Sequence, residues 1–240
     1  MIYTMKRLLS ISLLLIIALT LSACGNESTS NSPSHSEPAQ AQSEAATEET
    51  TSAVPDPDTL VFGGYYGYKN GVSDKSLEDI TWYILAEEDD KLLLCSTEAL
   101  FCSKYHSKTT DNVTWETSEI RNKLNDEFYN VAFTDAEKDR ICSTTLEDTG
   151  TTDKVFLLSK EEADKYLPVH LKNNCPAREY IVRMNLMQTY GDNGTCKWWL
   201  RTPGTEPERF LYVSYNAEHQ NTQGTPNNTY GICPAIWINK

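Results

Sequence analysis

The stretch CKWWLRTPG, residues 196–204, holds the side chains of this sequence that are best suited to binding chemistry. Tryptophan rings stack on sugars and on peptide side chains, and arginine forms paired hydrogen bonds with a carboxylate. Neighbouring side chains of a strand point to opposite faces, so Trp198 and Leu200 share one face. Trp199 and Arg201 share the other. We expect the first pair to pack in the core and the second pair to be the candidate binding face.

An alternative arrangement leaves no binding face on this strand. If both of its faces are covered, Arg201 pairs with an internal carboxylate such as that of Glu116 or Glu119. Tyrosine is also common at binding surfaces, and the sequence has 13 tyrosines. We therefore add Tyr212 and Tyr215, which lie in the next predicted strand, to the binding candidates.

Standard catalytic motifs are missing from the sequence. It has no GxSxG elbow, HExxH pair, Walker loop or dinucleotide-binding fingerprint. His106, His170 and His219 each lie among polar residues, which is typical of surface histidines. We therefore assign no catalytic residue, and whether the protein is an enzyme stays open.

Two short segments carry possible metal ligands. Residues 191–194, Gly-Asp-Asn-Gly, could offer oxygen atoms to Ca²⁺, but a turn accounts for the same composition. Cys102 and His106 form half of a zinc site without a second half, and no CxxC pair is present. We therefore expect neither a metal nor a cofactor.

The N-terminal segment has the pattern of an export signal. A basic pair, Lys6 and Arg7, precedes an apolar stretch that is short for a membrane span of about 20 residues. The end of this stretch, LSAC, resembles the lipobox of bacterial lipoproteins, in which the cysteine receives lipid. The resemblance implies a lipoprotein signal peptide over residues 1–23 and lipidation of Cys24. The alternative is an ordinary secretory signal with an incidental cysteine.

Residues 24–58 contain no Lys or Arg and no Phe, Trp or Tyr, and we expect them to be a disordered acidic tether. Such a tether holds the single globular domain of residues 59–240 away from the bilayer. Removing Lys6 and Arg7 with the signal lowers the net charge from −13 to −15, which disfavours nucleic acid as a partner. We therefore expect the protein at the cell membrane, on its extracytoplasmic side, with the membrane as a partner through the lipid.

Export also bears on the cysteines, because disulfides persist outside the cytosol. Six cysteines follow Cys24, and this even number favours three bridges whose connectivity the spacing leaves open. We expect Cys175 to pair with Cys196 and so to fix the loop that leads into Trp198. The disulfide candidates are Cys95, Cys102, Cys142, Cys175, Cys196 and Cys233.

The globular domain begins with strand patterns. Residues 80–86 alternate as a strand with Trp82, Ile84 and Ala86 on one side, and residues 91–96 are its predicted hairpin partner. Short strand candidates separated by polar loops also fill the last third of the chain.

Helical patterns lie between these two sets of strands. Apolar residues at helical spacing predict a helix within residues 114–133. Two capping boxes, at residues 134–137 and 159–162, each start a shorter helix. Residues 153–158, between them, are a predicted strand. The order of strands, helices and strands indicates an α+β domain rather than an alternating parallel one.

Six motifs, in order along the globular part, resemble a family of bacterial domains of unknown function with WWLRSPG and RPALW motifs. The resemblance implies an exported protein or lipoprotein. The motif style is similar to domains of C-type lectin-like fold, which implies small mixed sheets, two or three short helices, long irregular loops and disulfide staples. Cys233 stands where the family has the arginine of RPALW, and a cysteine there favours a disulfide. The motifs are FGxY at 62–65, IxW at 80–82, TWExSxIRxxLN at 114–125, FLLS at 156–159, WWLRxPG at 198–204 and PAIW at 234–237.

These observations favour a lipid-anchored binding module at the cell surface, with a carbohydrate or a protein as its ligand and without catalysis. Two alternatives stay open. One is an enzyme that modifies or hydrolyses envelope polymers, and the other is a purely structural surface domain.

Overall fold

The computed structural model describes residues 56–67, 76–109, 112–190, 194–215 and 222–240. The chain divides into two units, Met1–Glu49 and Thr50–Lys240, and all described residues belong to the second. The predicted signal peptide, Cys24, most of the tether and His219 lie outside the described residues. Within the described ranges no helix is long and apolar enough to cross a membrane.

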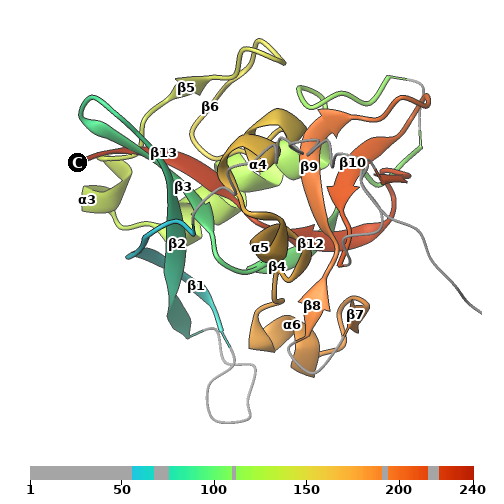
Figure 1. Cartoon of the computed structure of the whole chain (residues 1–240), viewed down its shortest axis with the longest axis horizontal. Helices are drawn as coiled ribbons and strands as arrows, with labels where there is room; N and C mark the ends of the chain where they lie inside the picture. Colours follow the sequence, from blue (N-terminus) through green and yellow to red (C-terminus); the bar gives the residue numbers. More distant parts are fainter. Residues whose placement is uncertain (1–55, 68–75, 110–111, 191–193, 216–221) are drawn as a thin grey trace, which may run out of the picture. The chain divides into compact units, whose positions relative to one another are not determined.

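A four-stranded antiparallel sheet forms one half of the fold, in the order β1-β2-β3-β13 (Figure 1). The predicted hairpin is confirmed, because β2 and β3 pair through the turn at Asp89 and Asp90. The expected side-chain pattern is partly wrong: a bulge between Ile84 and Ala86 shifts the register, and Leu85 is buried in their place. The strands are β1 (Thr59–Tyr66), β2 (Leu77–Glu88), β3 (Lys91–Ser96) and β13 (Ala235–Asn239).

A five-stranded sheet forms the other half, in the order β11-β10-β9-β12-β4. The two sheets are joined directly, because only Cys233 and Pro234 separate β12 from β13. Trp198 on β9 pairs in parallel with Gly231 on β12, so the WW strand is central in this sheet. The strands are β4 (Phe101–Lys104), β9 (Trp198–Pro203), β10 (Phe210–Val213), β11 (Gln223–Gly224) and β12 (Thr229–Ile232).

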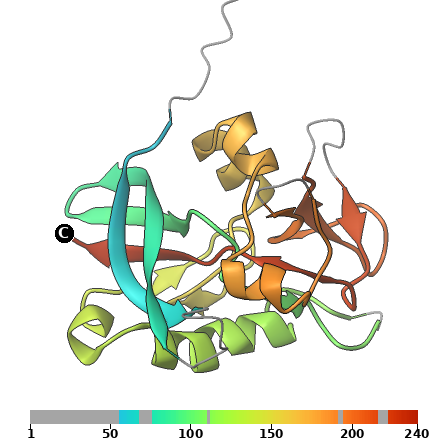
Figure 2. The same ribbon diagram turned by 90° about the horizontal axis from the view of Figure 1, so that it is seen from below.

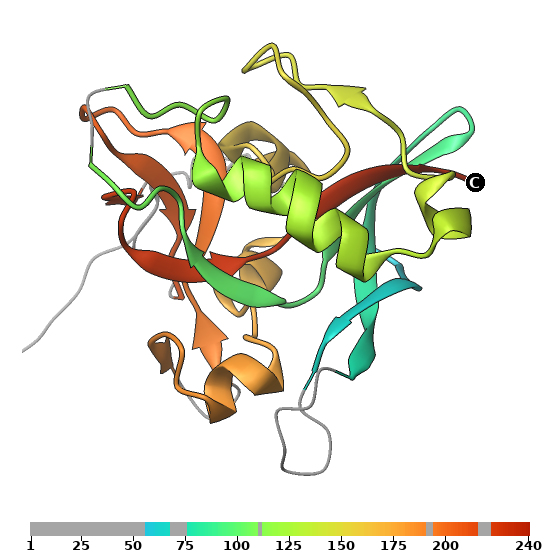
Figure 3. The ribbon, with the colours of Figure 1, turned by 180° about the vertical axis from the view of Figure 1, so that it is seen from behind.

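One long helix crosses the side of the molecule next to both sheets (Figures 2 and 3). It consists of α1 (Glu119–Lys123), a π-helical turn η1 (Leu124–Phe128) and α2 (Tyr129–Ala132), which follow one another without a break. Ser118 caps it by accepting a hydrogen bond from the Arg121 amide. The predicted helix is confirmed in position, and the apolar residues on which it was based are fully buried, namely Ile120, Leu124 and Phe128.

The predicted strand over residues 153–158 is wrong for most of its length. Only its first residue lies in β6 (Thr152–Asp153), which pairs with β5 (Thr144–Thr145), and Phe156 forms a single bridge to Ala235. The Asn125 side chain takes the place of a strand neighbour: its Oδ1 accepts from the amides of Lys154 and Val155, and its Nδ2 donates to the Val155 carbonyl.

Four short helices accompany the long one, so the described part of the chain has five helices rather than the expected two or three. Both predicted capping boxes are confirmed, with Thr134 and Ser159 as the N-caps. Sequence analysis missed two helices whose N-caps, Pro168 and Arg178, make no side-chain capping bond. The four helices are α3 (Asp135–Lys138), α4 (Lys160–Tyr166), α5 (Val169–Asn173) and α6 (Glu179–Arg183), and the remaining small sheet pairs β7 (Thr189–Tyr190) with β8 (Thr195–Cys196).

Candidate functional site

Arg201 on β9 is an internal residue that joins two carboxylates from different segments. Its side chain is 3% exposed. The guanidinium donates from Nε to both oxygens of Asp148, at 3.0 and 2.9 Å, and from its terminal nitrogens to Glu162, at 2.6 and 3.0 Å. A further bond of 2.8 Å reaches the Leu157 carbonyl. Although burial alone lowers the pKa of Arg201, its hydrogen bonds with Glu162 and Asp148 raise it above the ordinary value.

The structure therefore shows the alternative arrangement, in which Arg201 pairs with internal carboxylates, but these carboxylates are not the expected ones. Asp148 and Glu162 take the places expected of Glu116 and Glu119. Glu119 lies elsewhere and accepts hydrogen bonds from Ser107. These bonds lower the pKa of Glu119.

Both faces of β9 are covered. Trp198 and Trp199 are 2% and 0% exposed, and each indole donates its N–H to a backbone carbonyl, of Lys172 and Ser103 respectively. The face expected for Trp198 is confirmed. Trp199 is buried on the opposite face of β9, where Tyr105 and Tyr230 pack on its ring, so that the ring offers no surface to a ligand.

The two candidate tyrosines each pack against another tyrosine, and neither lines the cavity beside Arg201 that is described below. Tyr212 packs on Tyr230, with ring centroids 4.6 Å apart, and Tyr215 stacks on Tyr190 at 3.5 Å. The Lys197 ammonium lies 5.4 Å from the Tyr212 ring. All of these tyrosines are half-buried. Their role in binding stays a prediction, and the structure does not bring them to Arg201.

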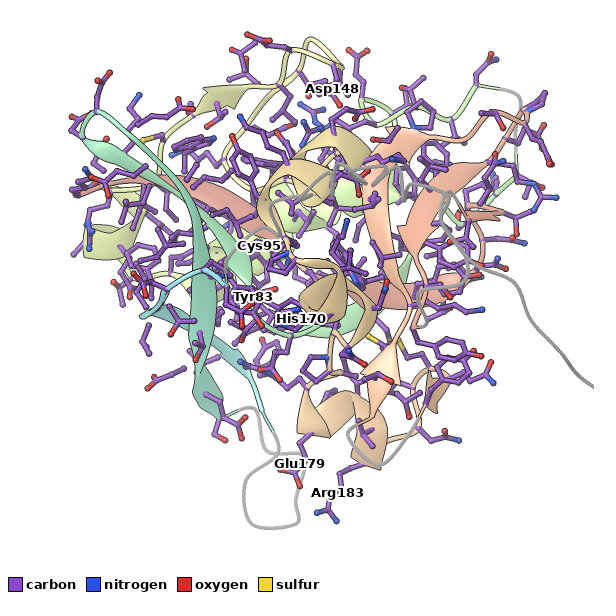
Figure 4. The ribbon with its side chains drawn as sticks, in the orientation of Figure 1. Tyr83, Cys95, Asp148, His170, Glu179 and Arg183 are labelled. Atoms are coloured by element: carbon purple, nitrogen blue, oxygen red, sulfur yellow. The ribbon has the colours of Figure 1, made fainter. Side chains whose placement is uncertain are left out.

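Sequence analysis missed a cavity of about 580 Å³ that lies beside Arg201. Figure 1 shows the elements around it, with the β5–β6 connection above α4 and the ends of β3 and β13 beside them. Asp148, labelled in Figure 4, lies in the β5–β6 connection and lines the cavity. A volume of this size is typical of sites that hold a small molecule. The lining residues are Glu88, Lys91, Leu93, Cys142, Ser143, Thr144, Thr145, Leu146, Glu147, Asp148, Ser159, Glu161, Glu162, Tyr166, Arg201 and Trp237.

Three of the six sequence motifs reach this cavity. Ser159 ends the FLLS motif, Arg201 belongs to WWLRxPG, and Trp237 ends PAIW. The three residues come from separate parts of the chain and meet only in the fold. Arg201 fixes the cavity wall by holding the loop that contains Asp148 against the first turn of α4. In that turn the Glu162 carboxylate also accepts a hydrogen bond from the Ser159 amide.

The cavity is rich in carboxylates, and three of them lack a direct side-chain partner among the described residues, although Glu88 interacts electrostatically with Lys165. Glu88, Glu147 and Glu161 form no side-chain hydrogen bond or ion pair with any described residue, whereas Asp148 and Glu162 are held by Arg201. Five acidic side chains thus face two basic ones across the lining. Trp237 and Tyr166 add two half-buried aromatic rings. This composition suits a ligand that combines positive charge with a ring or an apolar face.

The remaining candidates are dispersed. His106 lies 3.8 Å from Glu119, and His170 lies 3.1 Å from Asp56. No metal-binding group of three or more His, Cys, Asp or Glu side chains occurs among the described residues. The predicted turn at 191–194 is described only at Gly194.

No two described sulfur atoms lie at bonding distance, and all six cysteines after Cys24 are free thiols in this structure. The expected bridge between Cys175 and Cys196 is not formed. Instead, Cys175 Sγ lies 3.3 Å from Cys233 Sγ.

Comparison with known proteins gives a family without an assigned activity. No curated protein and no solved structure is similar enough to the chain to count as a match. Residues 89–240 match the model of a family described as a domain of unknown function, DUF6273. The matched segment is more than half of the chain and includes α4, β9 and β13, which line the cavity. The chain therefore belongs to the DUF6273 family.

Proposed function

We propose that this protein is a lipid-anchored binding module of the cell surface and that its ligand occupies the cavity beside Arg201. The observation that carries the proposal is the meeting of Ser159, Arg201 and Trp237, from three separate sequence motifs, on the wall of one cavity. Ser159 and Arg201 are buried and hold the wall in place, as the N-cap of α4 and as the centre of the ion-pair network, and Trp237 is the half-buried member that a ligand can reach.

The composition of the lining favours, as the ligand, a carbohydrate that bears a protonated amine. Sugar rings stack on tryptophan, which Trp237 supplies, whereas the Tyr166 ring already has the Lys165 ammonium 4.5 Å from its centroid. An ammonium group is attracted both by aromatic faces and by carboxylates such as those of Glu147 and Glu161. Serine and threonine hydroxyls between them can exchange hydrogen bonds with sugar hydroxyls. An amino sugar combines all three features.

Calorimetric titration of the full chain in detergent tests this ligand. The titrants are β-linked glucosamine oligosaccharides, in the free-amine form and in the N-acetylated form, at a mildly acidic pH that keeps the amine charged. We expect the free-amine form to bind more tightly. Glu161→Gln should weaken its binding about tenfold, which corresponds to roughly 1.4 kcal/mol for one charge-assisted contact. Glu116→Gln, an exposed glutamate outside the cavity, is the matched control.

A thiol in the cavity wall provides a second readout. Cys142 lines the cavity, whereas Cys102 does not. A bound sugar should slow alkylation of Cys142 and leave the rate at Cys102 unchanged. The proposal fails if neither sugar binds, or if binding leaves Cys142 unprotected. Release of shortened products from the oligosaccharide would favour the enzymatic alternative, an enzyme that acts on envelope polymers.

The proposal also includes the lipid anchor at Cys24 and a C-type lectin-like fold. Mass spectrometry of the N-terminal peptide should find acyl chains on Cys24, and Cys24→Ser should release the protein from the membrane fraction. A C-type lectin-like arrangement is supported by the two small sheets, one of them mixed, and by the irregular segments between their strands.

A further inference from the structure

Four buried cysteines meet where the two sheets join. Cys95 lies on β3, Cys175 follows α5, Cys196 lies on β8, and Cys233 stands between β12 and β13. None of the four is more than 5% exposed. Figure 4 shows Cys95 in the middle of the molecule, beside its strand partner Tyr83. Thiols from four distant segments have thus been brought into one part of the core.

Cys175 is the central member of this cluster. Its sulfur lies 3.3 Å from that of Cys233, and its carbonyl accepts a hydrogen bond of 3.0 Å from the Cys196 amide. A methyl group on Gly231 would come within 2.9 Å of Cys196 Sγ, so this glycine makes room for the sulfur. Hydrogen bonds from Cys196 and Cys233 lower the pKa of Cys175, whereas the pKa values of both donors are raised.

We propose that Cys175 carries a single disulfide that exchanges between two partners, Cys233 and Cys196. This inference rests on the export that the proposed function includes, since an oxidising compartment supplies the bond. It departs from the three bridges that the even cysteine count favours. Three cysteines remain. Cys142 Sγ lies 3.3 Å from Asn239 Oδ1, and Cys102 Sγ lies 3.7 Å from the Leu186 carbonyl. Cys95 makes no side-chain hydrogen bond with a described residue.

The bond forms by ordinary thiol–disulfide chemistry with an external disulfide as the oxidant. The Cys175 thiolate attacks that disulfide, makes a mixed disulfide and releases one external thiol. The Cys233 thiolate then attacks the Cys175 sulfur and releases the second external thiol, so that two electrons pass from the protein to the oxidant. Since Cys175 is buried in the folded chain, this oxidation precedes closure of the core.

Exchange within the folded chain needs no oxidant. The Cys196 thiolate attacks the Cys175 sulfur, the Cys175–Cys233 bond breaks, and Cys233 leaves as a thiolate that takes up the proton lost by Cys196. Because Cys175 takes part in both bridges, the two bridges exclude each other. One of the two partners is therefore always a free thiol.

Peptide mapping of the full chain tests the proposal. The chain is refolded in glutathione disulfide and glutathione, trapped with acid and an alkylating agent, and digested at low pH. We expect two cross-linked species, Cys175–Cys233 and Cys175–Cys196, and in each molecule four free thiols among the six cysteines that follow Cys24. Three bridges, a single fixed partner, or a bridge that excludes Cys175 would overturn the proposal.

Variants separate the partners. Cys196→Ala should give Cys175–Cys233 alone, and Cys233→Ala should give Cys175–Cys196 alone. Cys142→Ala, the matched control, should keep both bridges and lose one alkylation site. Mapping of wild-type protein trapped directly in cells distinguishes failure of the exchange from failure of the proposed export. If the cysteines are reduced in cells but both bridges form in glutathione, export is refuted and the exchange stands.

Discussion

The ion-pair network of Arg201 makes a quantitative prediction about stability. Arg201→Met removes five hydrogen bonds and leaves Asp148 and Glu162 without their cation. Breaking a buried ion pair costs about 3–5 kcal/mol. The lower end applies here, because the two carboxylates keep 36% and 27% of their side-chain surface and can regain water. For a domain of this size, a loss of about 3 kcal/mol lowers the melting temperature by roughly 6–12 °C.

Two further variants give this prediction its controls. Arg201→Lys keeps the charge but cannot hold both carboxylates in a planar fork, so we expect it to lose about half as much stability. Arg183→Met removes an exposed pair with Glu179, seen at the edge of Figure 4, and should change stability by less than about 0.5 kcal/mol.

The assay is urea unfolding followed by tryptophan fluorescence, with the midpoint and the slope both recorded. The reasoning is refuted if Arg201→Met costs no more than Arg183→Met, or if Arg201→Lys is as stable as the native protein. Either result would mean that the network does not hold the cavity wall.

Three other predictions concern local contacts. Asn125→Leu leaves the amide and carbonyl of Val155 without their side-chain partner and should cost about 2–4 kcal/mol in urea unfolding, whereas Asn125→Ser should lose less because its hydroxyl can still hydrogen-bond. Burial raises the pKa of Glu137, but its hydrogen bonds, chiefly with Thr134, outweigh this effect and lower the pKa below its ordinary value. Its contribution to stability is therefore present above pH 4.5 and lost as the pH falls, and Glu137→Gln should reduce the fall in the free energy of unfolding measured at acidic pH. The proposed Cys175–Cys233 bridge would join residues 58 positions apart, so its reduction should lower the free energy of unfolding by about 4 kcal/mol in a denaturation curve measured with reductant.

Local signals explain which elements the sequence predicted correctly. The two capping boxes involve only residues three apart, and the structure contains both of them, at Thr134 and Ser159. The helix around Leu124 follows from its apolar period, and the β2–β3 hairpin from its turn. α5 and α6 lack side-chain caps, so nothing local marks their starts.

Long-range pairing explains what the sequence could not give. The partners of Arg201 are 53 and 39 residues away, and no spacing rule selects Asp148 and Glu162 among many acidic residues. The alternation of side chains along a strand placed Trp198 correctly in the core. The opposite face of the strand is covered by Tyr105 and Tyr230, which pack on Trp199 and come from distant parts of the chain. The cavity is likewise made by segments that meet only after folding.

If the N-terminal segment anchors the protein to a membrane as proposed, the position of β1 has a mechanical consequence. The chain enters the described fold just before Thr59, on an edge strand whose only strand partner is β2. The sheet carries a pull between the proposed anchor and a ligand at Trp237 across the β1–β2, β2–β3 and β3–β13 ladders. Outside the sheet, β1 is also held by Glu137, which accepts the Gly63 amide, and by Arg178, which donates to the Tyr65 carbonyl. The β1–β2 ladder takes the load first. Under tension β1 should therefore peel away before the cavity opens, so that the tether lengthens while the ligand stays bound.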